Sequence, residues 1–184
     1  MKEAEKPRVV ARRIAYSGAY LGLRVDDVVM PDGSMVVREV VDHPGAVVIA
    51  ALDKAGRVAL ARQYRHAVED DLLELPAGVI DTGEQPSVAA ARELREEAGV
   101  ACARLDSLGS FFSSPGFLHE ELHAFLAREL AHVGTDPDDD EDIEIEWHDL
   151  AGLLGEPGRL RDAKTLAALL LVDAFLRREE TSGA

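Results

Sequence analysis

Cysteine, aromatic residues and basic residues are all scarce in this sequence. Cys102 is the only cysteine, so no disulfide can form within the chain, and a reducing compartment is expected. Lysine and arginine number 20 against 35 aspartates and glutamates, and the net charge of −15 disfavours nucleic acid and anionic membranes as partners. The sequence contains no apolar run of roughly 18 residues and no apolar segment typical of a secretion signal, so a cytoplasmic protein is expected.

Three of the acidic residues form an ordered cluster on a predicted helix. A proline at the first turn and a glycine after the last predict a helix over residues 86–98. Glu93, Glu96 and Glu97 are spaced i, i+3, i+4 on it and share one face, where like charges require either solvent or a cation such as Mg2+. The apolar residues predicted to form the core-facing side, opposite the acids, are Ala91, Leu94 and Ala98.

The first part of the chain predicts a small antiparallel β unit. Residues 8–42 contain three strand-like runs, and Pro-Asp-Gly-Ser at 31–34 predicts a hairpin turn between the last two. Three short strands bury little surface by themselves, so this unit is expected to dock on something else, such as another chain. The expected organisation is an N-terminal β unit over 1–42 and a larger domain over 43–184.

Strands and helices alternate through the larger domain. The apolar runs 47–52 and 58–63 predict a hairpin, and the first, apolar on both faces, predicts a central buried strand. Helical spacing returns at 163–178 with a wide apolar face. This order predicts an α+β fold with helices on the faces of a sheet.

The acidic helix belongs to a longer pattern, G-x5-E-x7-R-E-U-x-E-E-x-G-U, in which U is a bulky apolar residue. Its fixed positions are all filled, by Gly78, Glu84, Arg92, Glu93, Leu94, Glu96, Glu97, Gly99 and Val100. The segment resembles a complete Nudix box. That resemblance implies an α/β/α sandwich with a mixed sheet, and hydrolysis of a nucleoside diphosphate linked to another group with Mg2+ or Mn2+.

The resemblance also implies roles for individual residues. Glu93 and Glu97 become the principal metal ligands and catalytic carboxylates, with Glu96 beside them and the carbonyl of Ala77 as a backbone ligand. A metal fits this chemistry because it neutralises the diphosphate and lowers the pKa of an attacking water.

Three other box residues are expected to support the site. Arg92 should pair with Glu84 or Glu96 and hold the loop on the helix. Gly78, like Gly83, should permit an unusual loop backbone.

Three further segments resemble the ADP-ribose pyrophosphatase branch of the family: 63–66, 74–78 and 114–120. This resemblance implies that Arg65 contacts a phosphate as a fork-shaped donor. It implies that Glu120 faces the metals or the terminal ribose, and that the backbone of Gly116 and Phe117 lines the substrate pocket. For each residue taken alone, an ordinary surface or turn position is the alternative.

In the same branch, strands before the Nudix domain often cross over to a second subunit. Residues 1–42 are therefore expected to mediate a homodimer or domain swap. Tyr20 lies where the partner would supply groups to the adenine, so it either stacks on the base or packs in the dimer interface.

The general base is expected in the acidic run at 136–146. Relatives of this branch carry a glutamate there, and Glu141 fits best by its position before the next strand. Neighbouring aspartates at 139, 140 and 142 and the box glutamates remain alternatives. A base among so many like charges would have a raised pKa, which suits proton abstraction near neutral pH.

Other functions are also compatible with parts of the sequence. The run His119–His123 matches the zinc-protease pattern H-E-x-x-H, but its strand-like surroundings disfavour the helix which that site needs. The expected activity is hydrolysis of ADP-ribose to AMP and ribose 5-phosphate, or of a related nucleoside diphosphate sugar. A GDP-sugar as substrate and a non-catalytic nucleotide-binding sensor are the alternatives.

Overall fold

The computed structural model describes residues 5–134 and 143–182, and its chain divides into two compact units. Unit 1 comprises Met1–Gly45 and Phe112–Glu121. Unit 2 comprises Ala46–Phe111 and Leu122–Ala184. The segment Phe112–Glu121 thus folds with the N-terminal strands, from which it is far away in sequence.

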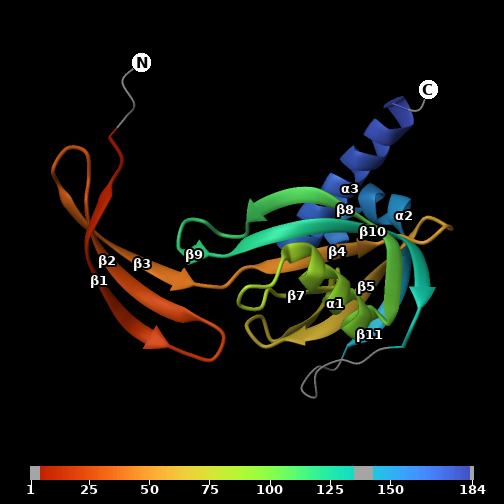
Figure 1. Ribbon diagram of the computed structural model, residues 1–184, viewed down its shortest axis with the longest axis horizontal. Coiled ribbons are helices and arrows are strands. Elements are labelled where there is room, and N and C mark those ends of the chain that lie inside the picture. Colours follow the sequence, from red (N-terminus) through yellow and green to blue (C-terminus); the bar gives the residue numbers. More distant parts are fainter. Residues whose placement is uncertain (1–4, 135–142, 183–184) are drawn as a thin grey trace. The chain divides into compact units, whose positions relative to one another are not determined.

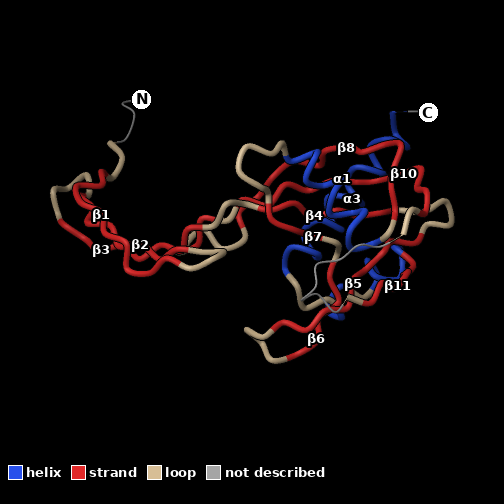
Figure 2. The backbone as a smooth tube through the Cα atoms, turned by 60° about the horizontal axis from the view of Figure 1, so that its bottom comes forward, coloured by secondary structure: helices blue, strands red, loops and turns tan. Residues whose placement is uncertain are grey.

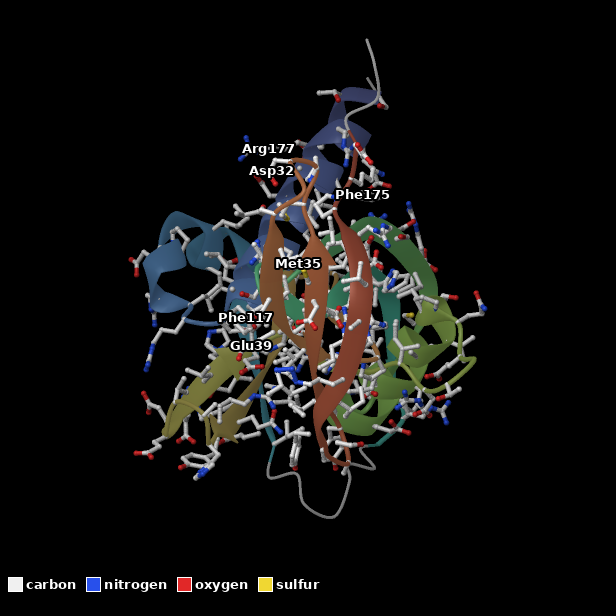
Figure 3. The ribbon with its side chains drawn as sticks, turned by 90° about the vertical axis from the view of Figure 1, so that its left-hand side faces the viewer. Asp32, Met35, Glu39, Phe117, Phe175 and Arg177 are labelled. Atoms are coloured by element: carbon white, nitrogen blue, oxygen red, sulfur yellow. The ribbon has the colours of Figure 1, made fainter. Side chains whose placement is uncertain are left out.

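The residues of unit 1 that the structure describes form one four-stranded sheet in the order β1-β2-β3-β9. Its strands are β1 (Arg8–Ser17), β2 (Gly22–Val29), β3 (Met35–Asp42) and β9 (Leu118–His119). The first three are antiparallel, as predicted, and β9 adds in parallel with Leu118 opposite Val41. The β2–β3 turn is fixed because the carboxylate of Asp32 accepts hydrogen bonds from the backbone N–H and hydroxyl of Ser34. Figure 3 labels Asp32 in this turn, with Met35 and Glu39 along β3.

The described part of unit 2 contains two sheets, in the orders β7-β4-β10-β8 and β11-β5-β6, and three α-helices (Figure 1). The strands are β4 (Ala46–Ala51), β5 (Arg57–Arg65), β6 (Asp70–Glu74), β7 (Ala77–Val79), β8 (Val100–Phe112), β10 (Glu121–His132) and β11 (Glu144–Asp149). The helices are α1 (Pro86–Ala98), α2 (Leu150–Gly155) and α3 (Ala163–Ser182), with a 3-10 turn at Pro157–Arg159. The first sheet is mixed, because β4 pairs in parallel with β10 and antiparallel with β7.

The central strand β4 explains the layering of unit 2. Its side chains alternate between the two sheet faces. Val47 and Ile49 belong to the core that α1 covers, while Val48 and Ala50 belong to the core that α2 and α3 cover. The strand is therefore apolar throughout, and the predicted α/β/α sandwich with a mixed sheet is confirmed.

The predicted hairpin of residues 47–52 and 58–63 is wrong in its pairing. Both strands form, but across the described chain a single bridge between Leu52 and Val58 joins β4 to β5, and each strand then continues in a different sheet (Figure 2). The carboxylate of Asp53 fixes the turn by accepting hydrogen bonds from the backbone of Ala55 and Arg57. The chain reverses at 53–56 as predicted, but β5 pairs instead with β6 and β11.

In the part of the chain that the structure describes, no helix combines the length and hydrophobicity needed to cross a membrane.

Candidate active site

The acidic helix α1 begins at Pro86 and ends at Ala98, as the sequence predicted. Gln85 makes no side-chain cap, so proline pre-organisation alone marks its start. Gly99 ends the helix in the left-handed conformation, with φ 65° and its N–H donating to the carbonyl of Arg95 at 3.1 Å. The helix therefore has a fixed length, which fixes the side-chain positions of its glutamates.

The acids of α1 do not lie opposite its core face, contrary to the sequence-based expectation. Glu93 is 9% exposed and Glu97 only 5%, and both adjoin the buried Leu94. Ala91, predicted to face the core, is exposed. Two carboxylates buried this deeply require partners, because burying an uncompensated charge is costly. Glu96, by contrast, is partly exposed.

Arg92 supplies much of that compensation. Its guanidinium donates through Nε and Nη2 to Glu84 at 3.2 and 3.0 Å, and through Nη1 to Glu93 at 2.6 Å and Glu96 at 3.0 Å. Nη2 also donates to the carbonyl of Val79 at 3.1 Å. The predicted pairing with Glu84 or Glu96 is thus confirmed for both. Hydrogen bonding to Glu84 is the main cause of the raised pKa of Arg92, and Arg92 in turn holds the pKa of Glu84 below its ordinary value.

Gly78 makes space for one of the buried acids. A Cβ at this position would lie 2.0 Å from Cδ of Glu93, so any side chain would displace that carboxylate. The expectation of an unusual backbone is correct for Gly83, with φ 83°, and wrong for Gly78, whose φ is not positive. Gly78 is required by the close approach of a side chain rather than by its own dihedral angles.

Glu97 connects α1 to the strand that precedes the loop. Its Oε2 accepts a hydrogen bond from the backbone N–H of Ala77, at 3.1 Å, in β7. Ala77 pairs with Val48 of the central strand. The first residue of β7 and the last acid of the box are therefore held side by side, which brings Glu97 close to the backbone expected to supply a ligand.

The donor set suits a hard divalent cation. Glu93, Glu96 and Glu97 offer only carboxylate oxygens, and the space at Gly78 lets the Glu93 carboxylate lie against β7. Within the described residues, no three His, Cys, Asp or Glu side chains already stand in metal-binding geometry. Arg92 engages one oxygen each of Glu93 and Glu96. A carboxylate has about four lone-pair sites, so an arginine contact and a cation are compatible on the same group.

Arg65 lies at the end of β5 in a bidentate pair with Glu74. Nε and Nη2 donate to the two carboxylate oxygens at 2.9 and 2.7 Å. The hydrogen bonds to Glu74 raise the pKa of Arg65, and the charge of Glu97 contributes, so the guanidinium lies in the field of the box. Burial alone would raise the pKa of Glu74, but Arg65 and Lys164 outweigh it and lower that pKa. Sequence reasoning missed Lys164, which donates to the same carboxylate from α3.

Four predicted substrate residues lie in unit 1. The Gly116 and Phe117 positions line a cavity of about 300 Å3. Its other walls come from the same unit, namely Arg24, Val40, Phe112, Pro115, Leu118 and His119. Glu120 has an oxygen 3.8 Å from Nε2 of His43, and Tyr20 is 75% exposed. These roles stay predictions.

Two other sequence-based hypotheses have different outcomes. Glu141, the predicted general base, lies outside the described residues. The zinc-protease pattern fails, because His119 ends β9 and His123 lies in β10, so the two histidines are on strands and not on one helix.

A mixed sheet between α1 and α3, with buried glutamates of α1 against β7, defines a Nudix-type domain. The NUDIX domain matches residues 42–169, and the chain therefore belongs to this family. It is 37% identical to an ADP-ribose pyrophosphatase of Bacillus subtilis over 92% of this chain and 93% of the relative. It is 40% identical to the ADP-ribose pyrophosphatase of Mycobacterium tuberculosis, over 77% and 70% respectively. A crystal structure of an ADP compounds hydrolase has the same fold, with a TM-score of 0.85, 24% identity, and coverage of 97% of this chain and 98% of that one.

Proposed function

We propose that this Nudix enzyme hydrolyses the diphosphate bond of ADP-ribose, giving AMP and ribose 5-phosphate. The observation that carries the proposal is the pair of buried acids, Glu93 and Glu97, held against β7 by Arg92, Gly78 and the Ala77 N–H. The identity of 37% to a relative named ADP-ribose pyrophosphatase, over almost the whole chain, supports this substrate.

The acids of α1 would hold a divalent cation, Mg2+ by preference and Mn2+ as a substitute. Glu93, Glu96, Glu97 and the carbonyl of Ala77 are the proposed ligands, because they are oxygen donors gathered on one helix face and the adjoining strand. A bound cation neutralises diphosphate charge and lowers the pKa of a coordinated water. Arg92 keeps the carboxylates oriented, and Glu84 keeps Arg92 in place.

The chain's own groups account for substrate binding and proton transfer in this proposal. Arg65, oriented by Glu74, contacts a phosphate through its planar fork. Glu141 accepts the proton of the attacking water. Glu120 faces the metals or the terminal ribose, and the Gly116–Phe117 backbone lines the pocket of unit 1.

A homodimer is part of the proposal, because unit 1 leaves much apolar surface in contact with water. Exposed side chains with large apolar groups include Ile14 at 64%, Tyr20 at 75% and Met35 at 66%. A second copy of unit 1 would cover these side chains. Tyr20 then either stacks on the adenine or packs between subunits. With one cysteine and a net charge of −15, we place the enzyme in the cytoplasm, without a nucleic-acid or membrane partner.

A substrate screen tests the proposal directly. ADP-ribose, other ADP-sugars and GDP-sugars are incubated with the protein and Mg2+ or Mn2+ in 18O-labelled water, and products are identified by mass spectrometry. The expected result is AMP and ribose 5-phosphate, with one of them labelled. Faster turnover of a GDP-sugar would show that this sugar nucleotide, and not ADP-ribose, is the preferred substrate. Binding of ADP-ribose without any product would show that the protein is a sensor.

A further inference from the structure

Glu74 is a buried carboxylate between two cations from different parts of unit 2. It is the last residue of β6 and only 2% exposed. Arg65 reaches it from β5 with two hydrogen bonds, and Lys164 reaches it from α3 through Nζ. A carboxylate this far from water requires such partners, and Lys164 is as much a part of its environment as Arg65.

Lys164 is itself held in place by the start of α3. Its Nζ lies 3.1 Å from Oδ2 of Asp162. The same oxygen accepts hydrogen bonds from the backbone N–H and the hydroxyl of Thr165, at 2.9 and 2.6 Å, and so caps the helix. Asp162, Lys164, Glu74 and Arg65 thus form a chain of alternating charges with no net charge.

A short backbone segment connects this series of charged side chains to the acids of the box. The hydroxyl of Thr165, which is fully buried, accepts a hydrogen bond at 2.8 Å from the N–H of Leu75. Two residues later, the N–H of Ala77 donates to Glu97. The segment from Glu74 to Ala77 is therefore fixed by α3 at its start and by α1 at its end. The position of Arg65 relative to Glu97 depends on both helices.

The pairing with Glu74 uses two of the N–H donors of Arg65, and the remaining donors lie in the same plane and can bind a phosphate. A guanidinium has five N–H donors in fixed geometry. Glu74 receives the hydrogen bonds from Nε and Nη2. Because the group is planar, holding two donors sets the direction of the others, and a stationary Glu74 is needed for that direction to be constant.

We propose that Lys164 is a positioning residue of this enzyme, which fixes Glu74 and through it aims the Arg65 guanidinium at a substrate phosphate. The inference rests on the proposed function in one respect, which is that Arg65 binds a substrate phosphate. Lys164 itself contacts Glu74 and not the substrate. The same contacts can be tested without any substrate, so the two proposals can fail separately.

The first experiment measures Arg65 alone. In 15N-arginine-labelled protein without substrate, the Nε–H signal of Arg65, assigned with an Arg65→Lys variant, should exchange slowly with water because Glu74 accepts that proton. Lys164→Met should accelerate the exchange at least severalfold, and Lys164→Arg should restore most of the protection. An unchanged Arg65 signal in Lys164→Met would overturn the inference, whether or not ADP-ribose is the substrate.

Arg161→Met is the matched control. Arg161 lies just before α3, three residues ahead of Lys164, and like Lys164 it pairs with an acid of β6, but that acid is the exposed Asp70. Its loss should leave the Arg65 signal and the activity as they are. An equal response to Arg161→Met would show that any contact between these two elements orders Arg65, and it would overturn the specific role of Lys164.

The second experiment is kinetic, with ADP-ribose and Mg2+ on the full-length protein. Lys164→Met should raise KM about tenfold, the scale expected for groups that orient a binding residue, while kcat and the Mg2+ concentration for half-activation stay within about twofold. Adding Lys164→Met to Arg65→Met should change nothing further, because Lys164 acts through Arg65. Additive losses, or a fall in kcat at constant KM, would overturn the inference. If Lys164→Met does not fold, as judged by its melting curve, Lys164→Gln takes its place in both experiments.

Discussion

Strands β4 and β1 show how differently the two units are built. Every residue of β4 is buried, with α1 over one face and α2 and α3 over the other. Every residue of β1 is exposed, although the strand is longer and carries several apolar side chains. In its described part, unit 1 consists of strands and turns only. Unit 2 has a complete core of its own, whereas unit 1 has apolar surface that its own elements leave uncovered.

The buried charges of the site follow the same division. The described acids of the box, together with Arg92, Arg65, Glu74 and Lys164, belong to unit 2, where a packed core can hold charges in fixed positions. Unit 1 instead exposes large apolar side chains along β1 and β3. We therefore expect substitutions in unit 2 to change turnover without changing the oligomeric state. We expect substitutions on β1 to change the oligomeric state before they change turnover.

The largest expected effect is on turnover, in Glu97→Gln. The amide keeps the size of the side chain but removes the charge of a carboxylate that is 5% exposed and bonded to Ala77. Metal-dependent hydrolysis should fall by roughly a hundredfold or more, since even residues that only support a metal site cost 10- to 100-fold. Initial rates over a Mg2+ titration measure this, and sedimentation should still show the wild-type oligomer.

Glu156→Gln is the control for that variant, because Glu156 is an exposed acid of unit 2 beside Arg159. It should retain wild-type rates and metal dependence. Full activity in Glu97→Gln would contradict the assignment of the box acids as metal ligands.

A smaller loss is expected from Gly78→Ala, which adds one methyl group. That Cβ would lie 2.0 Å from Cδ of Glu93, so the carboxylate must move. Activity should fall about tenfold or more while the fold survives, because a side chain can shift more easily than the sheet. Rates and melting curves are compared with Gly155→Ala, whose Cβ would meet nothing within 4 Å. Equal activity in the two variants would show that the Glu93 position is not limiting.

The reverse behaviour is expected for Ile14→Lys on β1. Ile14 is 64% exposed in the chain, and in the proposed homodimer it is covered, where a lysine would have to be desolvated. The dimer dissociation constant should rise at least tenfold, as measured by sedimentation equilibrium. Leu170→Lys changes a side chain of α3 that is 54% exposed and should leave assembly unchanged. If Ile14→Lys assembles like the wild type, β1 is not at the interface.

The box helix could be predicted from sequence because its determinants are local. Pro86 and Gly99 set its ends, and i, i+3, i+4 spacing places the acids together. The pairing of β4 could not, because turn chemistry at 53–56 shows that the chain reverses but not which strands pair afterwards. Strand pairing depends on which faces must be buried, and β4 is apolar on both.

Long-range charge pairs explain what was missed in the site. Lys164 meets Glu74 across 90 positions, and nothing local to either residue indicates the partner. The burial of Glu93 and Glu97 was also unforeseen, because periodicity shows which residues share a face and not how wide the covered face becomes. The fixed glycine of the box does indicate this burial, because any side chain at Gly78 would occupy the space of the Glu93 carboxylate.

The smallest effect is expected at the far end of α3, where partly exposed ion pairs join the helix to the sheet. Glu179 accepts hydrogen bonds from Arg128 at 2.6 and 3.0 Å and from Arg104 at 2.7 Å, and these lower its pKa from 4.5 to about 2. A folded-state pKa below the unfolded value stabilises the fold above pH 4.5, and the contribution is lost as pH falls from 4.5 toward 2. Glu179→Gln should therefore lower the melting temperature near neutral pH by no more than a few degrees, because ion pairs in contact with water contribute little. The difference from wild type should shrink at about pH 3, and Glu180→Gln, which leaves the hydrogen bonds of Arg104 and Arg128 to Glu179 in place, is the control variant. If the difference in melting temperature stays constant down to that pH, the carboxylate charge of Glu179 does not stabilise this end of unit 2. Packing, such as that of Arg128 over the Phe175 ring, would then be the cause.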